Sequence, residues 1–93
     1  MTASEDLVVE CGEMLDISRV SEFYAELKMV IEEEKPVELD GSKVERIDTA
    51  GLQLLVAFCQ QLKTENRGMR WHEPSEALKR SAQLLGLMDE LGL

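Results

Sequence analysis

The side chains best placed to do chemistry lie in one short run, residues 47–52, with the sequence IDTAGL. Asp48 and Thr49 come where a connecting segment turns into an apolar helix, and a carboxylate or hydroxyl there can accept hydrogen bonds from the first free backbone N–H groups. Ala50 and Gly51 have little or no side chain, so another surface could approach the start of the helix closely. A phosphate group on Thr49 would lie at the positive end of the helix dipole, which favours it. The residues alone leave two interpretations open: a simple helix cap, which is the commoner case, and a modification site.

Strand and helix patterns alternate on both sides of this run. β-Prone segments at residues 7–11, 37–40 and 69–72 predict three strands. One helix, capped by Asp16 or Ser18, is predicted between the first two strands. A second helix is predicted from about Thr49 to Asn66, and a third opens at Pro74-Ser75 and closes at Gly86, with one apolar turn to follow at residues 88–93.

This alternation predicts an α/β fold in a single domain, residues 1–93. The sheet is expected to be small, largely parallel or mixed, with about three to four strands and with helices packed on it. Trp71 is expected to pack under a helix, and four methionines, Met14, Met29, Met69 and Met88, to fill the core. Spacings of three and four predict the buried helix stripes, which are Val20, Phe23, Tyr24, Leu27 and Ile31, then Leu52, Leu55, Val56, Cys59 and Leu62, and finally Leu78, Ala82 and Leu85.

The charge balance argues against several classes of partner. The chain of 93 residues has 19 acidic and 10 basic residues, with a formal net charge of −9. Binding to duplex nucleic acid requires a basic stripe, and the same negative charge disfavours anionic membrane surfaces. The first residues, MTASED, lack the pattern of a secretory signal, and the apolar run Leu54–Cys59 is far shorter than the roughly 20 residues that span a bilayer. We therefore expect a cytoplasmic protein without membrane insertion, with reduced thiols at Cys11 and Cys59.

Other residues that often do chemistry are better explained by packing. His72 is the only histidine, and with two distant cysteines it lacks the paired spacing of a metal site. We expect a partly exposed strand histidine and, on the helix stripe, a buried Cys59 that acts as a small hydrophobe. Asp16, Asp40 and Asp48 could cluster at the carboxyl ends of strands and bind Mg²⁺ or a small ligand. No base–nucleophile pair or phosphate loop supports an enzyme, so we expect no catalytic residue, metal or cofactor, and we keep a ligand sensor as a third hypothesis.

The run Asp48-Thr49-Ala50-Gly51-Leu52, placed between a strand and an apolar helix, resembles the signature of STAS domains. These are the anti-sigma factor antagonists and the related domains of sulfate transporters. The resemblance covers nearly the whole chain and includes Gly12-Glu13 before the first helix and the closing Pro74-Ser75 with Leu85-Gly86-Leu87. In antagonists of this family, the hydroxyl residue after the aspartate is phosphorylated by a partner kinase that is itself the anti-sigma factor. The resemblance therefore implies phosphorylation at Thr49.

The sequence departs from the family pattern at two places. Ala50 stands where a second hydroxyl is common, and residues 12–16, GEMLD, are one residue longer than the family's Gly-Glu-Leu-Asp stretch. Either Asp16 or Glu13 is therefore expected to face Thr49. Because the chain ahead of Gly12 is short, a leading edge strand is expected to be missing.

The resemblance implies a protein-interaction module whose docking to an anti-sigma factor kinase is switched by phosphorylation at Thr49. The alternative is an accessory STAS subunit of an ABC-type lipid transporter, which binds the ATPase subunit without a phospho-switch; such stand-alone proteins show a similar Asp-Thr-small-Gly-Leu run. The residues expected to contact the partner are Asp16, Asp48, Thr49, Ala50, Gly51 and Leu52.

Overall fold

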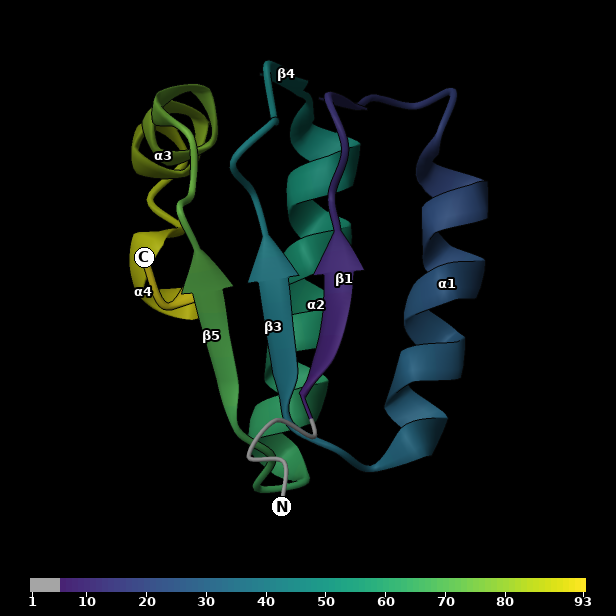
Figure 1. The fold of residues 1–93 in the computed structure, drawn as a ribbon. Coiled ribbons are helices and arrows are strands. Elements are labelled where there is room, and N and C mark those ends of the chain that lie inside the picture. Colours follow the sequence, from purple (N-terminus) through teal and green to yellow (C-terminus); the bar gives the residue numbers. More distant parts are fainter. Residues whose placement is uncertain (1–5) are drawn as a thin grey trace.

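The predicted alternation of strands and helices is confirmed by the computed structural model, which describes residues 6–93 (Figure 1). The prediction that the chain starts without a secretory signal falls almost wholly on residues 1–5, outside the described residues. The elements are β1 (Leu7–Glu10), β2 (Met14–Leu15), α1 (Val20–Glu33), β3 (Val37–Asp40), β4 (Arg46–Ile47), α2 (Thr49–Thr64), β5 (Met69–His72), α3 (Glu76–Leu84) and α4 (Met88–Leu91).

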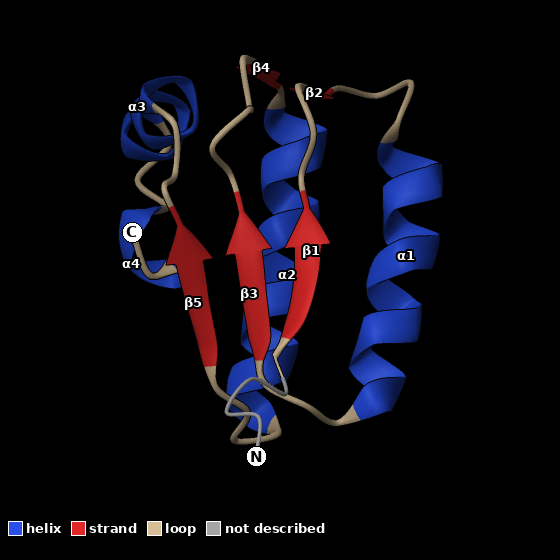
Figure 2. Ribbon diagram, viewed as in Figure 1, coloured by secondary structure: helices blue, strands red, loops and turns tan. Residues whose placement is uncertain are grey.

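Three strands form a parallel sheet in the order β1-β3-β5, in agreement with the predicted fold class. Leu7 is aligned with Val37, and Val37 with Met69. Each later strand is added on the same side of the one before it, so right-handed crossovers place α1 and α2 on one face of the sheet. Figure 2 shows α2 behind the sheet, with α1 and the α3–α4 pair toward its two edges.

The two faces of the sheet differ because successive strand residues point to opposite sides. Val9 and Leu39 are buried on the helix side. On the other side, the Arg70 guanidinium lies 3.6 Å from the Glu38 carboxylate. His72 is exposed, as predicted, with Nδ1 3.6 Å from the same carboxylate. This face is therefore polar and solvated, and the core forms only on the helix side.

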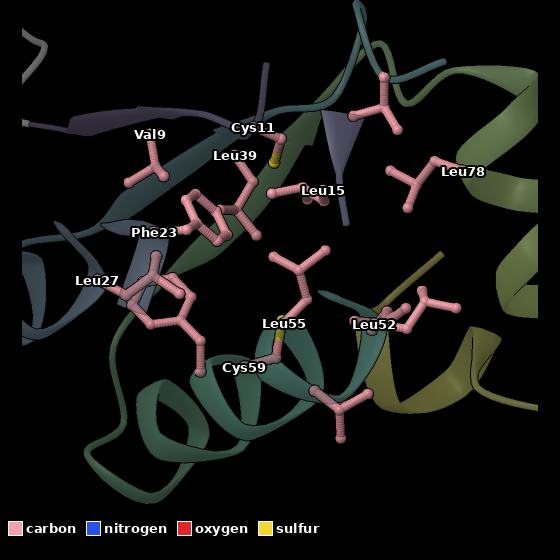
Figure 3. Close-up of a cluster of buried hydrophobic side chains, with 14 of the residues drawn as sticks. Val9, Cys11, Leu15, Phe23, Leu27, Leu39, Leu52, Leu55, Cys59 and Leu78 are labelled. Carbon is pink, nitrogen blue, oxygen red and sulfur yellow. The ribbon is translucent and has the colours of Figure 1, made fainter. Parts of the chain in front are cut away.

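The core joins the sheet to the helices through closely packed aliphatic and aromatic side chains (Figure 3). Val9 and Leu39 from the sheet meet Phe23 and Leu27 from α1 and Leu55 from α2, and none of these side chains is more than 4% exposed. Burying a side chain of this size stabilises the fold by about 1.5–3 kcal/mol. The predicted stripes of α1 and α2 are therefore largely confirmed as the core-facing sides of these helices.

A second, two-stranded parallel ladder joins β2 to β4, and the sequence pattern did not predict it. Two-residue strands are too short to show a period. Leu15 of β2 is fully buried, while Met14 beside it is 49% exposed, as alternation across a strand requires. Met14 is therefore not the core residue that the sequence predicts. β4 lies directly ahead of α2 in the chain, and the Asp48 N–H donates to the Leu15 carbonyl of β2, so the ladder holds the residue that starts α2.

The predicted cap of α1 is wrong, because neither Asp16 nor Ser18 caps the helix. The N-cap residue is Arg19, without a side-chain cap hydrogen bond. The Asp16 carboxylate instead accepts hydrogen bonds from the Ser18 N–H and hydroxyl, at 3.1 and 2.6 Å. These bonds close a turn before the helix, so the aspartate shapes the entry to α1 rather than its first turn.

Three further apolar side chains are exposed where the sequence predicts burial. Tyr24 is 52% exposed at the border of the α1 stripe, where its ring receives the Lys28 ammonium at 5.8 Å from the ring centre. Met29 is 70% exposed because it lies on the opposite side of α1 from the buried Leu27. Leu85, at the C-cap of α3, is 48% exposed.

The end of α1 is held by the buried guanidinium of Arg67. Its side chain, 6% exposed, donates to the backbone carbonyls of Val30, Ile31 and Lys35 and to the Glu65 carboxylate. A cation at the C-terminal carbonyls of a helix is favoured by the helix dipole. Arg67 therefore joins the end of α1 to the segment between α2 and β5.

The C-terminal helices pack back against the sheet. As predicted, α3 begins directly after Pro74-Ser75. Ser75 is its N-cap residue, with its hydroxyl accepting from the Leu78 N–H at 3.1 Å. The half-buried Trp71 donates from Nε1 to the Leu91 carbonyl at 2.7 Å, which confirms that it packs against a helix. Met69 and Met88 pack partly buried against the core. Among the described residues, no helix combines the length and the apolar character that crossing a membrane requires.

Candidate functional site

Asp48 forms the N-cap of α2. Its backbone is extended, and one carboxylate oxygen accepts from the Gly51 N–H at 3.1 Å. Thr49 is the first residue inside the helix, and its side chain is exposed. Among the hydrogen bonds of residues 6–93, none involves the Thr49 hydroxyl. The structure therefore assigns the capping role to Asp48 and leaves the Thr49 hydroxyl accessible.

The second carboxylate oxygen of Asp48 binds a different element. It accepts from the Ile17 N–H at 3.0 Å, in the loop between β2 and α1. One carboxylate thus positions both the start of α2 and a loop 31 residues earlier in the sequence. The Ile17 side chain on that loop is 74% exposed, which is unusual for an isoleucine.

Gly51 and Leu52 belong to the interior rather than to the surface. A Cβ atom at Gly51 would lie 2.4 Å from the Leu15 carbonyl oxygen and 3.2 Å from Ile47 Cγ1. The surface that approaches this glycine closely is therefore the protein's own β2–β4 ladder. Leu52 is 1% exposed and packs in the core. Neither residue offers an exposed side chain, although Leu52 lines the groove beside Thr49, so their contact with a partner stays a prediction.

A shallow groove of about 250 Å³ opens beside Thr49, between the start of α2 and the end of α3. Leu84 and Leu85 line it from α3 and are 79% and 48% exposed. We use the name α2 docking surface for the exposed side chains around the start of α2, which are Thr49, Leu84 and Leu85 at the groove and Ile17 on the loop that Asp48 binds. Sequence reasoning missed Ile17 and Leu84. Adjacent leucines at a helix end were the available signal, since both cannot face the core.

Among the hydrogen bonds of residues 6–93, none joins the side chain of Asp16 or Glu13 to Thr49. Asp16 precedes Ile17, and its carboxylate is engaged by Ser18. The Ser18 hydrogen bonds are the main cause that lowers the pKa of Asp16 below its ordinary value of 3.8, and the nearby Arg46 charge lowers it further. Ala50 is half-buried in the first turn of α2.

The three aspartates considered as a ligand site serve separate turns. Asp40 accepts from the Ser42 N–H and hydroxyl, chiefly the hydroxyl, and this lowers its pKa. Asp16 and Asp48 bind the neighbours described above. Within residues 6–93, no group of three or more histidine, cysteine, aspartate or glutamate side chains could hold a metal ion. The geometry therefore gives the ligand-sensor hypothesis no shared site.

Both cysteines are free and buried. Burial raises the pKa of the Cys59 thiol to about 11 and that of Cys11 to about 12, so both stay protonated at neutral pH. Cys59 is thus the buried small hydrophobe that its place on the stripe predicts. The groove beside the start of α2 carries two hydroxyl side chains, Thr49 and Ser81, among apolar neighbours.

Comparison with known proteins adds the family. The family described as "Mlab, STAS domain" matches residues 2–93. The chain belongs to the STAS domain family. The match covers almost the whole chain and places it among STAS-type interaction modules. No curated protein matches the sequence.

Solved structures share this STAS fold at low sequence identity. A sulfate transporter family protein from Wolinella succinogenes matches with a TM-score of 0.73 and 21% identity, over 91% of this chain and 70% of that one. The anti-sigma factor antagonist SpoIIAA in its unphosphorylated form matches with a TM-score of 0.69 and 17% identity, over 90% and 78%. The Bacillus cell fate determinant SpoIIAA in its phosphorylated form matches with a TM-score of 0.69 and 20% identity, over 96% and 82%.

Proposed function

We propose that this STAS domain docks a protein partner through the α2 docking surface and that phosphorylation of Thr49 switches the docking off. The observation that carries the proposal is the exposed Thr49 hydroxyl at the border of exposed apolar side chains. A kinase can reach this hydroxyl without unfolding α2. Leu84, Leu85 and Ile17 supply the apolar area that a protein partner would bury.

Charge gives the switch its direction. Phosphorylation adds about −1.5 to −2 charge at pH 7. In a docked complex this charge would be buried beside the Asp48 carboxylate and against leucine side chains, and both neighbours disfavour it. Losing a buried interface contact in this way typically costs about 2–5 kcal/mol, and 1.4 kcal/mol is about tenfold in affinity. The unmodified chain binds, and the modified chain is released.

The partner that fits this scheme is an anti-sigma factor that is also a serine or threonine kinase. The family includes SpoIIAA, an anti-sigma factor antagonist solved in both phosphorylated and unphosphorylated forms. In this proposal the domain works in the cytoplasm, in transcriptional signalling, and has no catalytic role of its own.

A second candidate is an accessory subunit that holds the ATPase of an ABC-type lipid transporter through the same surface. Ala50 favours it, because the second hydroxyl common in phosphorylated antagonists is absent while the Asp-Thr-small-Gly-Leu run is kept. The similarity to a sulfate transporter family protein also agrees with a role beside a transporter. In this case docking would be constitutive.

The test captures a partner with the tagged chain and follows Thr49 in the presence of ATP. Mass spectrometry is expected to find phosphate at Thr49, none in a Thr49→Val chain, and unchanged modification in a Ser81→Ala chain, which loses the other hydroxyl of the groove. An Ile17→Asp chain should capture little partner. Capture of a transporter ATPase with no phosphate at Thr49 would favour the second candidate, and capture unaffected by Ile17→Asp would contradict docking at this surface.

A further inference from the structure

We propose that the free edge of β1 binds an extended, basic segment of a partner protein, which adds a strand to the sheet. This edge is separate from the α2 docking surface, so the proposal does not depend on the phospho-switch. It rests on the hydrogen-bonding pattern of β1, on its neighbours along α1 and on the charges that border it.

The backbone of β1 has an unused side. In the part of the chain that the structure describes, β1 pairs with β3 alone. The Leu7 N–H donates to the Pro36 carbonyl and the Cys11 N–H to the Asp40 carbonyl. Alternate residues of a parallel strand bond to the same neighbour, so the N–H and C=O groups of Val8 and Glu10 point away from β3. Such groups are a template for another strand.

Helix α1 borders this edge without closing it. Figures 1 and 2 show α1 beyond β1, on the side away from β3, and its principal contacts are with α2. Arg19 links α1 to the end of the strand, because its guanidinium donates to the Cys11 carbonyl at 2.8 Å. The same guanidinium lies 3.7 Å from the Glu22 carboxylate and 3.9 Å from that of Glu26. Acidic side chains of α1 therefore flank the end of β1.

The charges select a basic occupant. Glu10 is exposed on β1, and Asp6 precedes the strand with its carboxylate 3.4 Å from Arg70. Glu22 and Glu26 lie near the Cys11 end of the strand, and these four carboxylates outnumber the guanidinium groups of Arg19 and Arg70. Between the two acidic positions, Val8 is 59% exposed and offers an apolar contact. A strand with lysine or arginine at alternate positions would meet the carboxylates while its backbone pairs with β1.

The same charges disfavour a second copy of this chain. Antiparallel pairing of two β1 strands centred on Val8 would place Asp6 of one copy opposite Glu10 of the other, twice. Like charges directly opposite across a strand pair destabilise it. The occupant that the edge fits is therefore a different, basic chain.

The test titrates the isotope-labelled full chain with a capped peptide of alternating lysine and valine, about eight residues long. Amide signals of Val8 and Glu10 are expected to shift, with slower hydrogen exchange, and added salt should weaken binding. A Val8→Pro chain loses an outward donor but no ladder hydrogen bond, and we expect a roughly tenfold or greater loss of peptide affinity. The matched Val8→Ala chain keeps the N–H and should bind. A peptide with glutamate in place of lysine should not bind.

Several results would overturn the proposal. They are an absence of β1 amide shifts at millimolar peptide, shifts confined to the α2 docking surface, and equal peptide affinity of the Val8→Pro and Val8→Ala chains. Should the proline chain fail to fold, the amide-shift map of the unaltered chain decides alone. A dimer in analytical ultracentrifugation that Val8→Pro breaks would assign the edge to a second copy and overturn the basic partner.

Discussion

At the amino end of the parallel strands, Arg67 donates hydrogen bonds to the free carbonyls at the end of α1. At their carboxyl end, Asp48 accepts hydrogen bonds from free N–H groups, and Thr49 beside it is exposed. The Arg67 guanidinium uses all five of its N–H donors and is almost buried. Asp48 is half-buried and borders exposed apolar side chains. The first end is built for stability. The second positions the start of α2 beneath the surface that we propose for docking.

The two ends differ in what the bonding side chain leaves exposed at a helix terminus. Each end satisfies the backbone groups that a helix terminus leaves unpaired. At the Arg67 end the bonding group is the guanidinium itself, whose side chain is 6% exposed. At the other end Asp48 supplies the cap, so the Thr49 side chain is not needed to cap α2. We therefore expect that the charge at position 49 can change without unfolding the helix.

The largest loss of stability is expected from Arg67→Met. The change leaves the carbonyls of Val30, Ile31 and Lys35 without their donor in a partly buried site, and we expect a loss of about 3 kcal/mol in the free energy of unfolding. Urea denaturation followed by circular dichroism measures it. Arg67→Lys, which supplies fewer donors, should recover only part of the stability that Arg67→Met loses. A loss below about 1 kcal/mol would show that the hydrogen bonds of Arg67 contribute little to stability.

Gly51→Ala is expected to cost about 2 kcal/mol, because its Cβ would lie 2.4 Å from a backbone oxygen of the β2–β4 ladder. The matched control is Gly68→Ala, whose Cβ would meet only Pro36 at 3.7 Å. The control should change stability by less than about 0.5 kcal/mol. Equal unfolding free energies for the two variants would contradict the close approach at Gly51.

Asp48→Ala removes the cap and the bond to Ile17 together. We expect a loss of about 1–2 kcal/mol in stability and weaker partner binding, because the loop that carries Ile17 is released. Asp48→Asn keeps one acceptor oxygen, so its stability should lie between those of the unaltered chain and the alanine variant. Amide exchange at Ile17 reports the loop directly. Unchanged amide exchange at Ile17 in the alanine variant would contradict the claim that Asp48 holds the loop of the docking surface.

Much of the frame could be predicted from the sequence, because burial imposes a period that a sequence displays. The strand at residues 37–40 and the α2 stripe through Leu55 and Cys59 follow directly from such periods. The β2–β4 ladder could not be predicted, because two-residue strands have no period. The hydrogen bonds of Arg67 reach carbonyls more than 30 residues away in the sequence, and no local pattern encodes such contacts.

The candidate site was predicted in part. The Asp48-Thr49 run indicated a helix start, but either side chain can cap a helix, so only the coordinates assign the cap to Asp48. The surface beside Gly51 could not be predicted for a similar reason. A glycine signals a close approach of some surface, and the sequence does not say that the surface is Leu15 of the same chain. The apolar border formed by Ile17 and Leu84 depends on tertiary packing.

The most direct test of the account measures partner affinity and thermal unfolding together for Thr49→Glu and Thr49→Ala. We expect both variants to unfold within a few degrees of the unaltered chain, because the Thr49 side chain is exposed and Asp48 supplies the cap. The alanine variant should bind the captured partner normally, and the glutamate variant at least about tenfold more weakly. Equal binding by both variants, or weaker binding accompanied by an equally large fall in the unfolding temperature, would contradict a docking surface controlled at Thr49.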